Sequence, residues 1–411
     1  MSAPALRARQ PLPNAFLPYG RQLIEEDDIA AVTEALRGNL LTTGPYVDRF
    51  EHALAKAVGA KHAVVCSNGT AALHMAARAL NLGAGTKIIV PAITFLATAS
   101  APHLNGAEIV FADVEPETGL MGPGDLEDAF KRAGQADAVF NVHVNGQCGD
   151  IEGIATIARA HDAKIVDDAC HAIGTGFVAE DGSLSQIGSN TFCDLTVFSF
   201  HPVKTIAMGE GGAVTTNDPE LAALLMRARN HGMTRKPDEF VNTEDAFDAD
   251  GTPNPWYYEC VAPEFNWRAN DIQCALGLSQ LSKLGRFVAR RRALAAAYDT
   301  LLAPFAPLVR PTARTRASLP AWHLYAARID FERAGISRAT VMRELAKDGI
   351  GSQVHYFPVH RQPFYANRYG ALSLPGAERY YDRALSLPLF ASMSVGDVER
   401  VATTLGNILG F

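Results

Sequence analysis

Three short segments of the sequence hold residues whose types and positions could do chemistry. Lys204 lies in VFSFHPVKTIAMGEGGAVTTND, after an apolar run rich in β-branched and aromatic residues and before a glycine-rich turn. Asp167 and Asp168 end the apolar run KIVDD, upstream of the lysine. Gly69 and Thr70 open a helical pattern in CSNGTAALHMAARAL. The chain thus offers an amine, a carboxylate and a helix N-terminus, each directly after a predicted strand.

These are the parts that a pyridoxal 5'-phosphate (PLP) site needs. A lysine condenses with the cofactor aldehyde, an aspartate pairs with the pyridinium nitrogen and makes the ring an electron sink, and a helix N-terminus binds the phosphate. The apolar VFSF before Lys204 predicts a buried lysine root, and desolvation lowers the pKa of an amine and makes it more nucleophilic. We therefore expect a catalytic role for Lys204 and for one of Asp167 and Asp168.

Each of these residues also has a simpler explanation. A lysine after a strand is usually a solvated surface residue, and paired acids at a strand end often cap the following helix. Thr70 fits a plain helix N-cap, although an exposed helix N-terminus is itself an anion site. Ser199, at the end of LTVFS, is a second candidate phosphate donor. The glycine-rich GEGG after Lys204 permits close backbone approach and favours the functional interpretation.

Two further side chains fit a cofactor ring or an ordinary core. Phe95, in PAITFLATA, is either a core aromatic or a residue that stacks on a flat ring. His171, three residues after Asp168, is either a structural hydrogen-bonding group or a contact on the same ring. A catalytic metal is not expected, because His355 and His360 in HYFPVHRQPF flank a proline instead of sharing a helix face.

The composition excludes several classes of protein. The 411 residues carry a formal net charge of −7 with 20% charged residues, and no basic excess favours nucleic-acid binding. Six scattered cysteines without a CxxC pair indicate a reducing compartment. Neither a secretory signal nor an apolar run long enough to cross a membrane is found. A cytoplasmic protein that does not bind membranes is expected.

The pattern of elements predicts an α/β fold. From about residue 61 to 217, apolar runs such as KIIVPA, AVFNVHV and KIVDD alternate with helical stretches such as TAALHMAARAL and IEGIATIARAH. This alternation is typical of a mostly parallel sheet with helices on both faces, whose ligands bind beyond the carboxyl ends of the strands. We expect a loose arm over 1–16, a large PLP-binding domain over 17–265 and a small α/β domain over 266–411. Residues 235–258 are polar and acidic and predict an irregular insertion.

Several motifs, in order, resemble those of one family. SNGTAALHMA, PAITFLATA, VDDACHAIG, FSFHPVKTIAMGEGGAVTTND, FNWRANDIQCALGLSQL and HYFPVH are similar to the DegT/DnrJ/EryC1/StrS sugar aminotransferases. The resemblance runs from about residue 17 to the C-terminus. It implies the type I (aspartate aminotransferase-like) fold of PLP-dependent transferases, PLP as cofactor and a homodimer with shared active sites.

The resemblance also assigns roles to residues. Lys204 resembles the Schiff-base lysine, Asp168 the partner of the pyridinium nitrogen, and His171 a residue near the phenolic oxygen of the cofactor. The remaining residues are implied as contacts of cofactor or substrate: Gly69, Thr70 and Ser199 to the phosphate, Phe95 to the ring, Asn266 to the cofactor of the opposite subunit, and His355, His360 and Arg268 to the substrate.

Within the family, the sequence is most similar to transaminases of the pseudaminic acid type, through FSFHPVKTI and the PWYYE before FNWR. This implies transfer of an amino group from L-glutamate to C4 of a UDP-linked 4-keto-6-deoxy-N-acetyl-hexosamine. Perosamine-type and bacillosamine-type C4 aminotransferases remain alternatives, as do a PLP-dependent sugar dehydratase and a regulatory protein of the same fold. Some relatives carry histidine in place of the lysine and are dehydratases. This chain keeps Lys204, which argues against a dehydratase.

Overall fold

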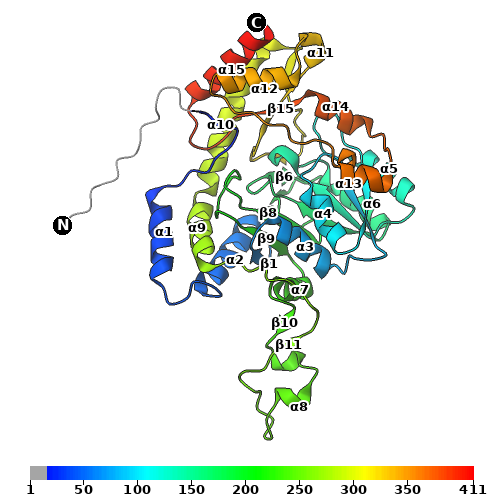
Figure 1. Ribbon diagram of the computed structural model, residues 1–411, viewed down its shortest axis with the longest axis vertical. Helices are drawn as coiled ribbons and strands as arrows, with labels where there is room; N and C mark the ends of the chain where they lie inside the picture. The colour runs from blue at the N-terminus through cyan, green and yellow to red at the C-terminus, as the bar shows by residue number, and fades with distance from the viewer. Residues whose placement is uncertain (1–15) are drawn as a thin grey trace, which may run out of the picture.

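The computed structural model describes residues 16–411 (Figure 1). The arm predicted over 1–16 lies outside the described residues, apart from Phe16. The chain builds a large body around a central sheet, a smaller unit at the C-terminal end and a narrow arm that projects from the body (Figure 1). Among the described residues, none of the helices combines the length and the hydropathy needed to cross a membrane.

A seven-stranded sheet forms the centre of the body, in the order β1-β9-β8-β5-β4-β2-β3. Only β9 runs antiparallel to its neighbours β8 and β1, and every other pairing is parallel. This confirms the predicted mostly parallel α/β sheet. Its strands are β1 (His62–Cys66), β2 (Lys87–Pro91), β3 (Glu108–Ala112), β4 (Ala138–Val142), β5 (Lys164–Asp168), β8 (Leu195–Ser199) and β9 (Gly212–Thr216).

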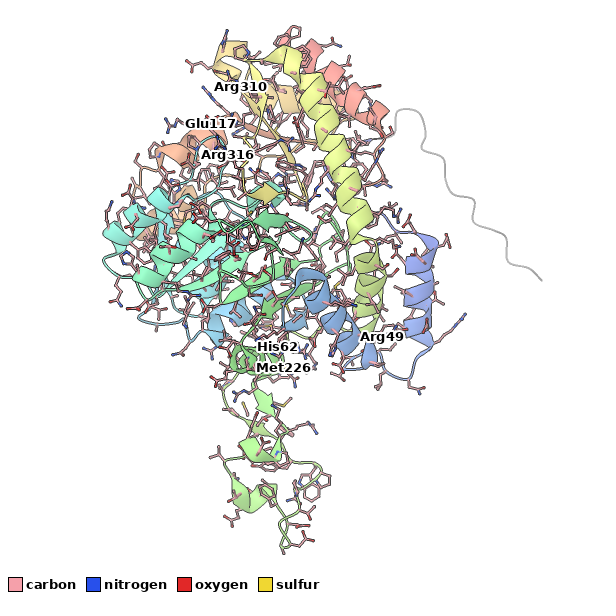
Figure 2. All side chains as sticks on the ribbon, turned by 180° about the vertical axis from the view of Figure 1, so that it is seen from behind. Arg49, His62, Glu117, Met226, Arg310 and Arg316 are labelled. Carbon is pink, nitrogen blue, oxygen red and sulfur yellow. The ribbon has the colours of Figure 1, made fainter. Side chains whose placement is uncertain are left out.

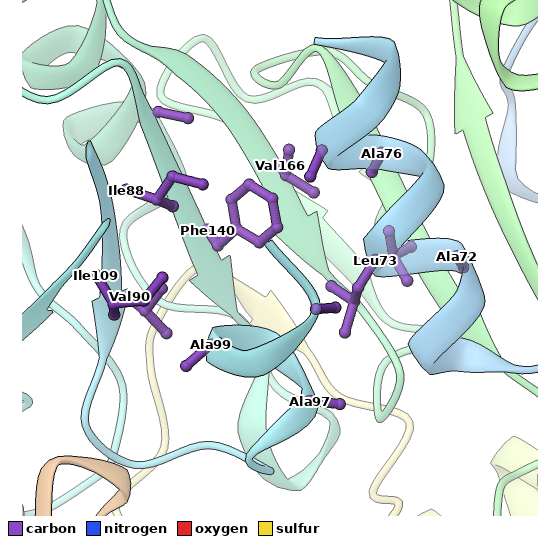
Figure 3. Close-up of a cluster of buried hydrophobic side chains, with 14 of the residues drawn as sticks. Ala72, Leu73, Ala76, Ile88, Val90, Ala97, Ala99, Ile109, Phe140 and Val166 are labelled. Carbon is purple, nitrogen blue, oxygen red and sulfur yellow. The ribbon is translucent and has the colours of Figure 1, made fainter. Parts of the chain in front are cut away.

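Successive side chains of each strand pack on opposite faces of the sheet, as the period of two requires. On β2, Ile88 and Val90 join the cluster around Leu73 and Phe140 that Figure 3 shows, whereas Ile89 joins the cluster on the other face. One face is covered by α3 (Gly69–Ala79), α4 (Ala97–Leu104) and α7 (Pro219–Arg229). The other is covered by α2 (Pro45–Val58), α5 (Pro123–Ala133) and α6 (Ile151–Ala160).

Two helices connect the body to the C-terminal unit. α9 (Asp271–Ser282) packs against α2 and α1 (Glu26–Arg37) of the body. After Lys283, α10 (Leu284–Leu302) runs into the C-terminal unit, where it packs against α15 (Val395–Leu409). Lys283 bonds to Asp27 and Asp28 of α1, and so holds the joint between the two helices to the body. The domain boundary at 265/266 stays a prediction.

The C-terminal unit has its own antiparallel sheet, in the order β12-β14-β15. Its core lies between this sheet and the helices α10, α12 and α15. The elements of this part of the chain are β12 (Val309–Pro311), β13 (Ser318–Leu319), β14 (Tyr325–Ile329), α11 (Phe331–Ala334), α12 (Arg338–Lys347), α13 (Pro363–Tyr369), α14 (Pro375–Arg383) and β15 (Ala384–Leu387). The strand predicted over HLYAARI is therefore confirmed as β14.

The predicted irregular insertion forms the projecting arm. It leaves the body beside Met226 (Figure 2) and is held at its base by the pairing of β10 (Met233–Thr234) with β11 (Glu259–Cys260). Only the short α8 (Thr243–Ala246) and one 3₁₀ turn interrupt its loops. A second small sheet, β13-β6-β7, joins β6 (Gly176–Val178) and β7 (Leu184–Gln186) to β13 of the C-terminal part of the chain.

Candidate functional site

A cavity of about 810 Å³ lies at the carboxyl ends of the parallel strands. Strand β5 ends at Asp168 and β8 ends at Ser199, and both residues line it. The cavity collects most of the residues that the sequence singled out. The predicted residues in its lining are Gly69, Thr70, Phe95, Asp168, His171, Ser199, Lys204 and His355.

The pleat of β5 separates the two candidate carboxylates. Asp168 lines the cavity, where its Oδ2 accepts a hydrogen bond from Thr98 Oγ1 at 2.7 Å and its Oδ1 accepts one from the Cys170 N–H at 3.1 Å. Asp167 points to the other face of the sheet, toward His143, with 3.3 Å between Oδ2 and Nε2. Asp168 is therefore the carboxylate that a ligand in the cavity can reach.

Asp167 is held as a buried anion. Burial opposes its ionisation, but His143 and the hydrogen bond from Asn141 Nδ2 at 3.1 Å hold the pKa of the carboxyl below its ordinary value. A buried charge keeps its ionised form only with such partners. Asp167 thus has a structural role behind the sheet.

Lys204 lies in a turn that follows β8. Its backbone N–H donates a hydrogen bond to the His201 carbonyl at 2.8 Å. Burial lowers the pKa of its amine below the ordinary value, while the interactions with Cys170 and Asp168 oppose the shift. Desolvation disfavours the ammonium form, so a larger fraction of the amine is neutral. The predicted burial of the lysine root agrees with this geometry, since the side chain is partly buried.

The N-terminus of α3 opens onto the cavity beside Ser199. Asn68 caps the helix by accepting the Ala71 N–H at 2.8 Å, and among the described residues the N–H groups of Gly69 and Thr70 have no protein acceptor. A Cβ at Gly69 would lie 3.0 Å from Ser199 Cβ and 3.3 Å from Cys170 Sγ. Glycine therefore keeps two N–H donors and the serine hydroxyl next to one another, which is the donor set of an anion site.

A cluster of aromatic side chains forms the opposite wall. The ring of His171 lies 4.4 Å from that of His323, and its Nε2 lies 3.0 Å from the hydroxyl of Tyr356. His355 bonds through Nδ1 to Ser386 Oγ at 2.8 Å. Phe95 is 52% exposed and lies 6.0 Å, centroid to centroid, from Tyr356, so its ring is open to a ligand.

Three residues of this wall escaped the sequence analysis: Thr98, His323 and Tyr356. Thr98 lies one helical turn after Phe95, and Tyr356 is adjacent to His355, so both stood beside predicted residues. His323 is the first residue of the predicted strand HLYAARI and looked like part of that strand. A ranking by sequence neighbourhood would have found Thr98 and Tyr356.

The structure does not bring the other three predicted residues to this cavity. His360 is buried against Phe111, with 6.1 Å between ring centroids, so within one protomer it is shielded from a ligand. Arg268 lines a different cavity of about 300 Å³, where its guanidinium bonds to Asn230 Oδ1. Asn266 is exposed and pairs with Asn230 through an isolated β-bridge.

Known proteins are similar to this chain in sequence and in fold along almost its whole length. A model of the DegT/DnrJ/EryC1/StrS aminotransferase family matches residues 22–406. The spore coat polysaccharide biosynthesis protein SpsC of Bacillus subtilis is 37% identical over 399 residues, which cover 96% of this chain and 98% of SpsC.

Solved structures give the same picture. PseC of Helicobacter pylori, an aminotransferase involved in the biosynthesis of pseudoaminic acid, superposes with a TM-score of 0.85 at 28% identity, over 96% of this chain and 99% of that one. Spr1654 of Streptococcus pneumoniae in its PLP form superposes with a TM-score of 0.82 at 26% identity, over 96% and 99%.

Proposed function

The chain belongs to the DegT/DnrJ/EryC1/StrS aminotransferase family and is a sugar aminotransferase with the fold of PLP-dependent aminotransferases and PLP as its cofactor; from this premise we propose its substrates and the roles of its residues. The amino donor is L-glutamate. The acceptor is C4 of a UDP-linked 4-keto-6-deoxy-N-acetyl-hexosamine. The observation that carries the proposal is the convergence of Lys204, Asp168 and the N-terminus of α3 on one cavity.

The residues of the cavity fit the cofactor. The N–H groups of Gly69 and Thr70 and the hydroxyl of Ser199 would hold the phosphate, because the lack of a side chain at Gly69 lets these three donors lie next to one another. The exposed ring of Phe95 would stack on the flat ring of the cofactor. The Nδ1 atom of His171, which is buried without a partner among the described residues, leaves a polar atom for the cofactor to satisfy.

PLP, when bound, supplies an electron sink for the carbanion of the amino acid. Asp168, fixed by Thr98 and the Cys170 N–H, would hold a proton on the ring nitrogen through its negative charge. The amine of Lys204, with its pKa lowered by burial, would take the proton from the α-carbon of glutamate as a general base and donate it to the aldehyde-derived carbon of the cofactor as a general acid.

We place the complete site in a homodimer. Asn266 is exposed and absent from the lining of its own cavity, so its side chain is available to a second copy of the chain. Arg268, two residues later, lies on the same side of the body and would contact the substrate from there. His355 would contact the substrate within its own protomer, since it lines the cavity.

Two relatives support a sugar of a surface glycan as the acceptor. SpsC is named for spore coat polysaccharide biosynthesis and PseC for pseudoaminic acid biosynthesis. A site that hydrogen-bonds a substituent rejects analogues that lack it by large factors. An N-acetyl substrate should therefore exceed its 2-hydroxy counterpart in kcat/KM.

The test is a panel of UDP-, GDP- and dTDP-linked 4-keto sugars, each incubated with the purified enzyme and ¹⁵N-labelled glutamate and then analysed by mass spectrometry. The proposal expects the ¹⁵N label in a UDP-N-acetyl product. Preference for GDP-4-keto-6-deoxymannose over every UDP-N-acetyl sugar would refute the assigned acceptor. Absence of pyridoxamine formation with glutamate alone would refute the donor.

A second candidate acceptor is another nucleotide 4-keto sugar, of the perosamine or bacillosamine type. The higher identity to SpsC than to PseC favours it, because the two relatives are named for different glycans. The same panel separates the two candidates by the nucleotide and the mass of the aminated product.

A further inference from the structure

One contact in the cavity has no part in the roles proposed so far. The hydroxyl of Tyr356 and Nε2 of His171 lie 3.0 Å apart, although 185 residues separate them in the sequence. The two rings are nearly parallel, with 5.9 Å between centroids and 29° between planes. The tyrosine comes from the C-terminal part of the chain and the histidine from the loop after β5. Their hydrogen bond therefore joins the two halves of the cavity wall.

Neutral histidine carries its proton on only one ring nitrogen, so this contact bears on the tautomer of His171. Burial, with the neighbouring Lys204 and His355, lowers the pKa of His171 well below its ordinary value, so the ring is neutral near pH 7. Burial raises the pKa of Tyr356 well above its ordinary value, so the phenol keeps its proton. One hydrogen then lies between the two atoms, and either partner can supply it.

The number of unsatisfied groups decides which partner donates. If Tyr356 donates to Nε2, the only group without a partner is the Nδ1–H of His171. If Nε2–H donates instead, both the Tyr356 proton and the Nδ1 lone pair lack a partner among the described residues. Each buried polar group left unpaired costs about 1–3 kcal/mol. The first arrangement is therefore favoured.

We propose that Tyr356 is a positioning residue that fixes His171 in the Nδ1–H tautomer, so that His171 presents a hydrogen-bond donor to the bound cofactor. This rests on the proposed function, in which His171 lies at the phenolic oxygen of the cofactor. A donor at this oxygen stabilises its ionised form. The Tyr356 hydroxyl would thus act on the cofactor through His171 and not by touching it.

The surroundings hold both rings in place for this task. The backbone of His171 meets that of Trp322 and His323 at Gly146, whose φ is 86°, and a Cβ there would lie 2.8 Å from the His171 carbonyl and 2.7 Å from the His323 nitrogen. Glycine permits this approach. His323 then packs its ring 4.4 Å from His171 and leaves the imidazole little freedom to turn.

The first experiment reads the tautomer without the cofactor. The full-length protein, freed of PLP and labelled with ¹⁵N-histidine, is examined by long-range ¹H–¹⁵N NMR, and His171→Gln assigns the His171 signals. The expected result is a neutral Nδ1–H ring in the wild type and a gain of the Nε2–H form in Tyr356→Phe. An Nε2–H wild type, or signals that Tyr356→Phe leaves unchanged, would overturn the proposal.

The second experiment uses the holoenzyme. The pH at which the absorbance of the bound cofactor changes should rise by about half a unit or more in Tyr356→Phe, and the same substitution should have no effect when added to His171→Gln. A shift that persists in the double variant would mean that Tyr356 contacts the cofactor directly. The matched control is Tyr365→Phe, which removes the hydroxyl of a buried tyrosine that does not line the cavity.

The two experiments separate this proposal from the proposed function. If PLP does not attach to Lys204, the holoenzyme titration and the proposed function both fail. The measurement on the PLP-free protein still tests whether Tyr356 fixes the tautomer of His171. If PLP attaches and the tautomer is Nε2–H, the function survives and the role of Tyr356 is refuted.

Discussion

Replacing Asp168 by asparagine removes one negative charge from the cavity and changes little else. The carboxylate is buried and accepts two hydrogen bonds, from Thr98 Oγ1 at 2.7 Å and from the Cys170 N–H at 3.1 Å. The amide keeps the size of the side chain and one acceptor oxygen. What it loses is one accepted hydrogen bond and the charge that, in the proposed function, would hold a proton on the ring nitrogen of the cofactor.

The magnitude follows from what that charge does to the pKa of its partner. An opposite charge in direct contact shifts a pKa by about 1–3 units, and each unit corresponds to about 1.4 kcal/mol. Loss of the carboxylate should therefore slow the half-reaction with glutamate by about 10- to 1,000-fold. Binding of PLP should survive, because the phosphate donors at Gly69, Thr70 and Ser199 are untouched.

The assay is single-turnover spectrophotometry of the PLP form mixed with glutamate, which follows conversion to the pyridoxamine form. The matched control is Asp167→Asn, which removes the neighbouring carboxylate from the other face of the sheet. That variant breaks the buried pair with His143 and should lower the melting temperature while the half-reaction stays near the wild-type rate. Near-normal rates in Asp168→Asn together with slow rates in Asp167→Asn would refute the reasoning.

Three further predictions follow from the same geometry. Borohydride reduction of the yellow holoenzyme should abolish the long-wavelength absorbance and leave a pyridoxyl group on the Lys204 peptide in a digest; a modified peptide elsewhere would exclude Lys204. Gly69→Ala should weaken PLP binding by about tenfold or more in equilibrium dialysis, because its Cβ would crowd Ser199, and unchanged binding would place the phosphate elsewhere. Mixing Lys204→Ala with an Asn266→Ala variant that binds PLP poorly should restore activity if the subunits share sites; no recovery, with subunit exchange shown separately, would contradict sharing.

The elements of the body could be predicted from the sequence because their patterns are local. KIVDD forms β5 from its first residue to its last, and α3 begins and ends one residue earlier than the helical pattern TAALHMAARAL. Each strand of the seven-stranded sheet carries buried apolar residues, and α3, α6 and α7 each begin at an Asn or Asp whose side chain caps the helix. The helical stretch from Asp271 to Leu302 consists of two helices, α9 and α10. Its break at Lys283 depends on Glu25, Asp27 and Asp28, which lie far away in the sequence.

The cavity could be predicted only where it is built from strand ends. Lys204, Asp168, Ser199 and Thr70 each lie at or directly after a predicted strand, and parallel strands bring their carboxyl ends to one edge of the sheet. Thr98 does not lie at a strand end, so this criterion misses it. It belongs to the cavity through one hydrogen bond to Asp168, which is 70 positions away in the sequence. The position of Arg268 could not be predicted either. The cavity that it lines is formed with Thr43 and Asp48, which lie more than 200 residues earlier in the sequence.

Asp167 and Asp168 are adjacent in the sequence but lie in different surroundings, because they point to opposite faces of the sheet. Successive side chains of β5 point to opposite faces, so only one of the two can reach the cavity. The other carboxylate lies 3.3 Å from His143 and anchors β5 to the strand beside it through Asn141. Because Asp167 fixes the strand that carries Asp168, its loss should change stability before it changes chemistry. The local pattern does not separate the two acids, and the family resemblance selects Asp168. In the structure the pleat turns Asp168 to the cavity, where the proposed reaction needs a carboxylate, and Asp167 to the opposite face of the sheet.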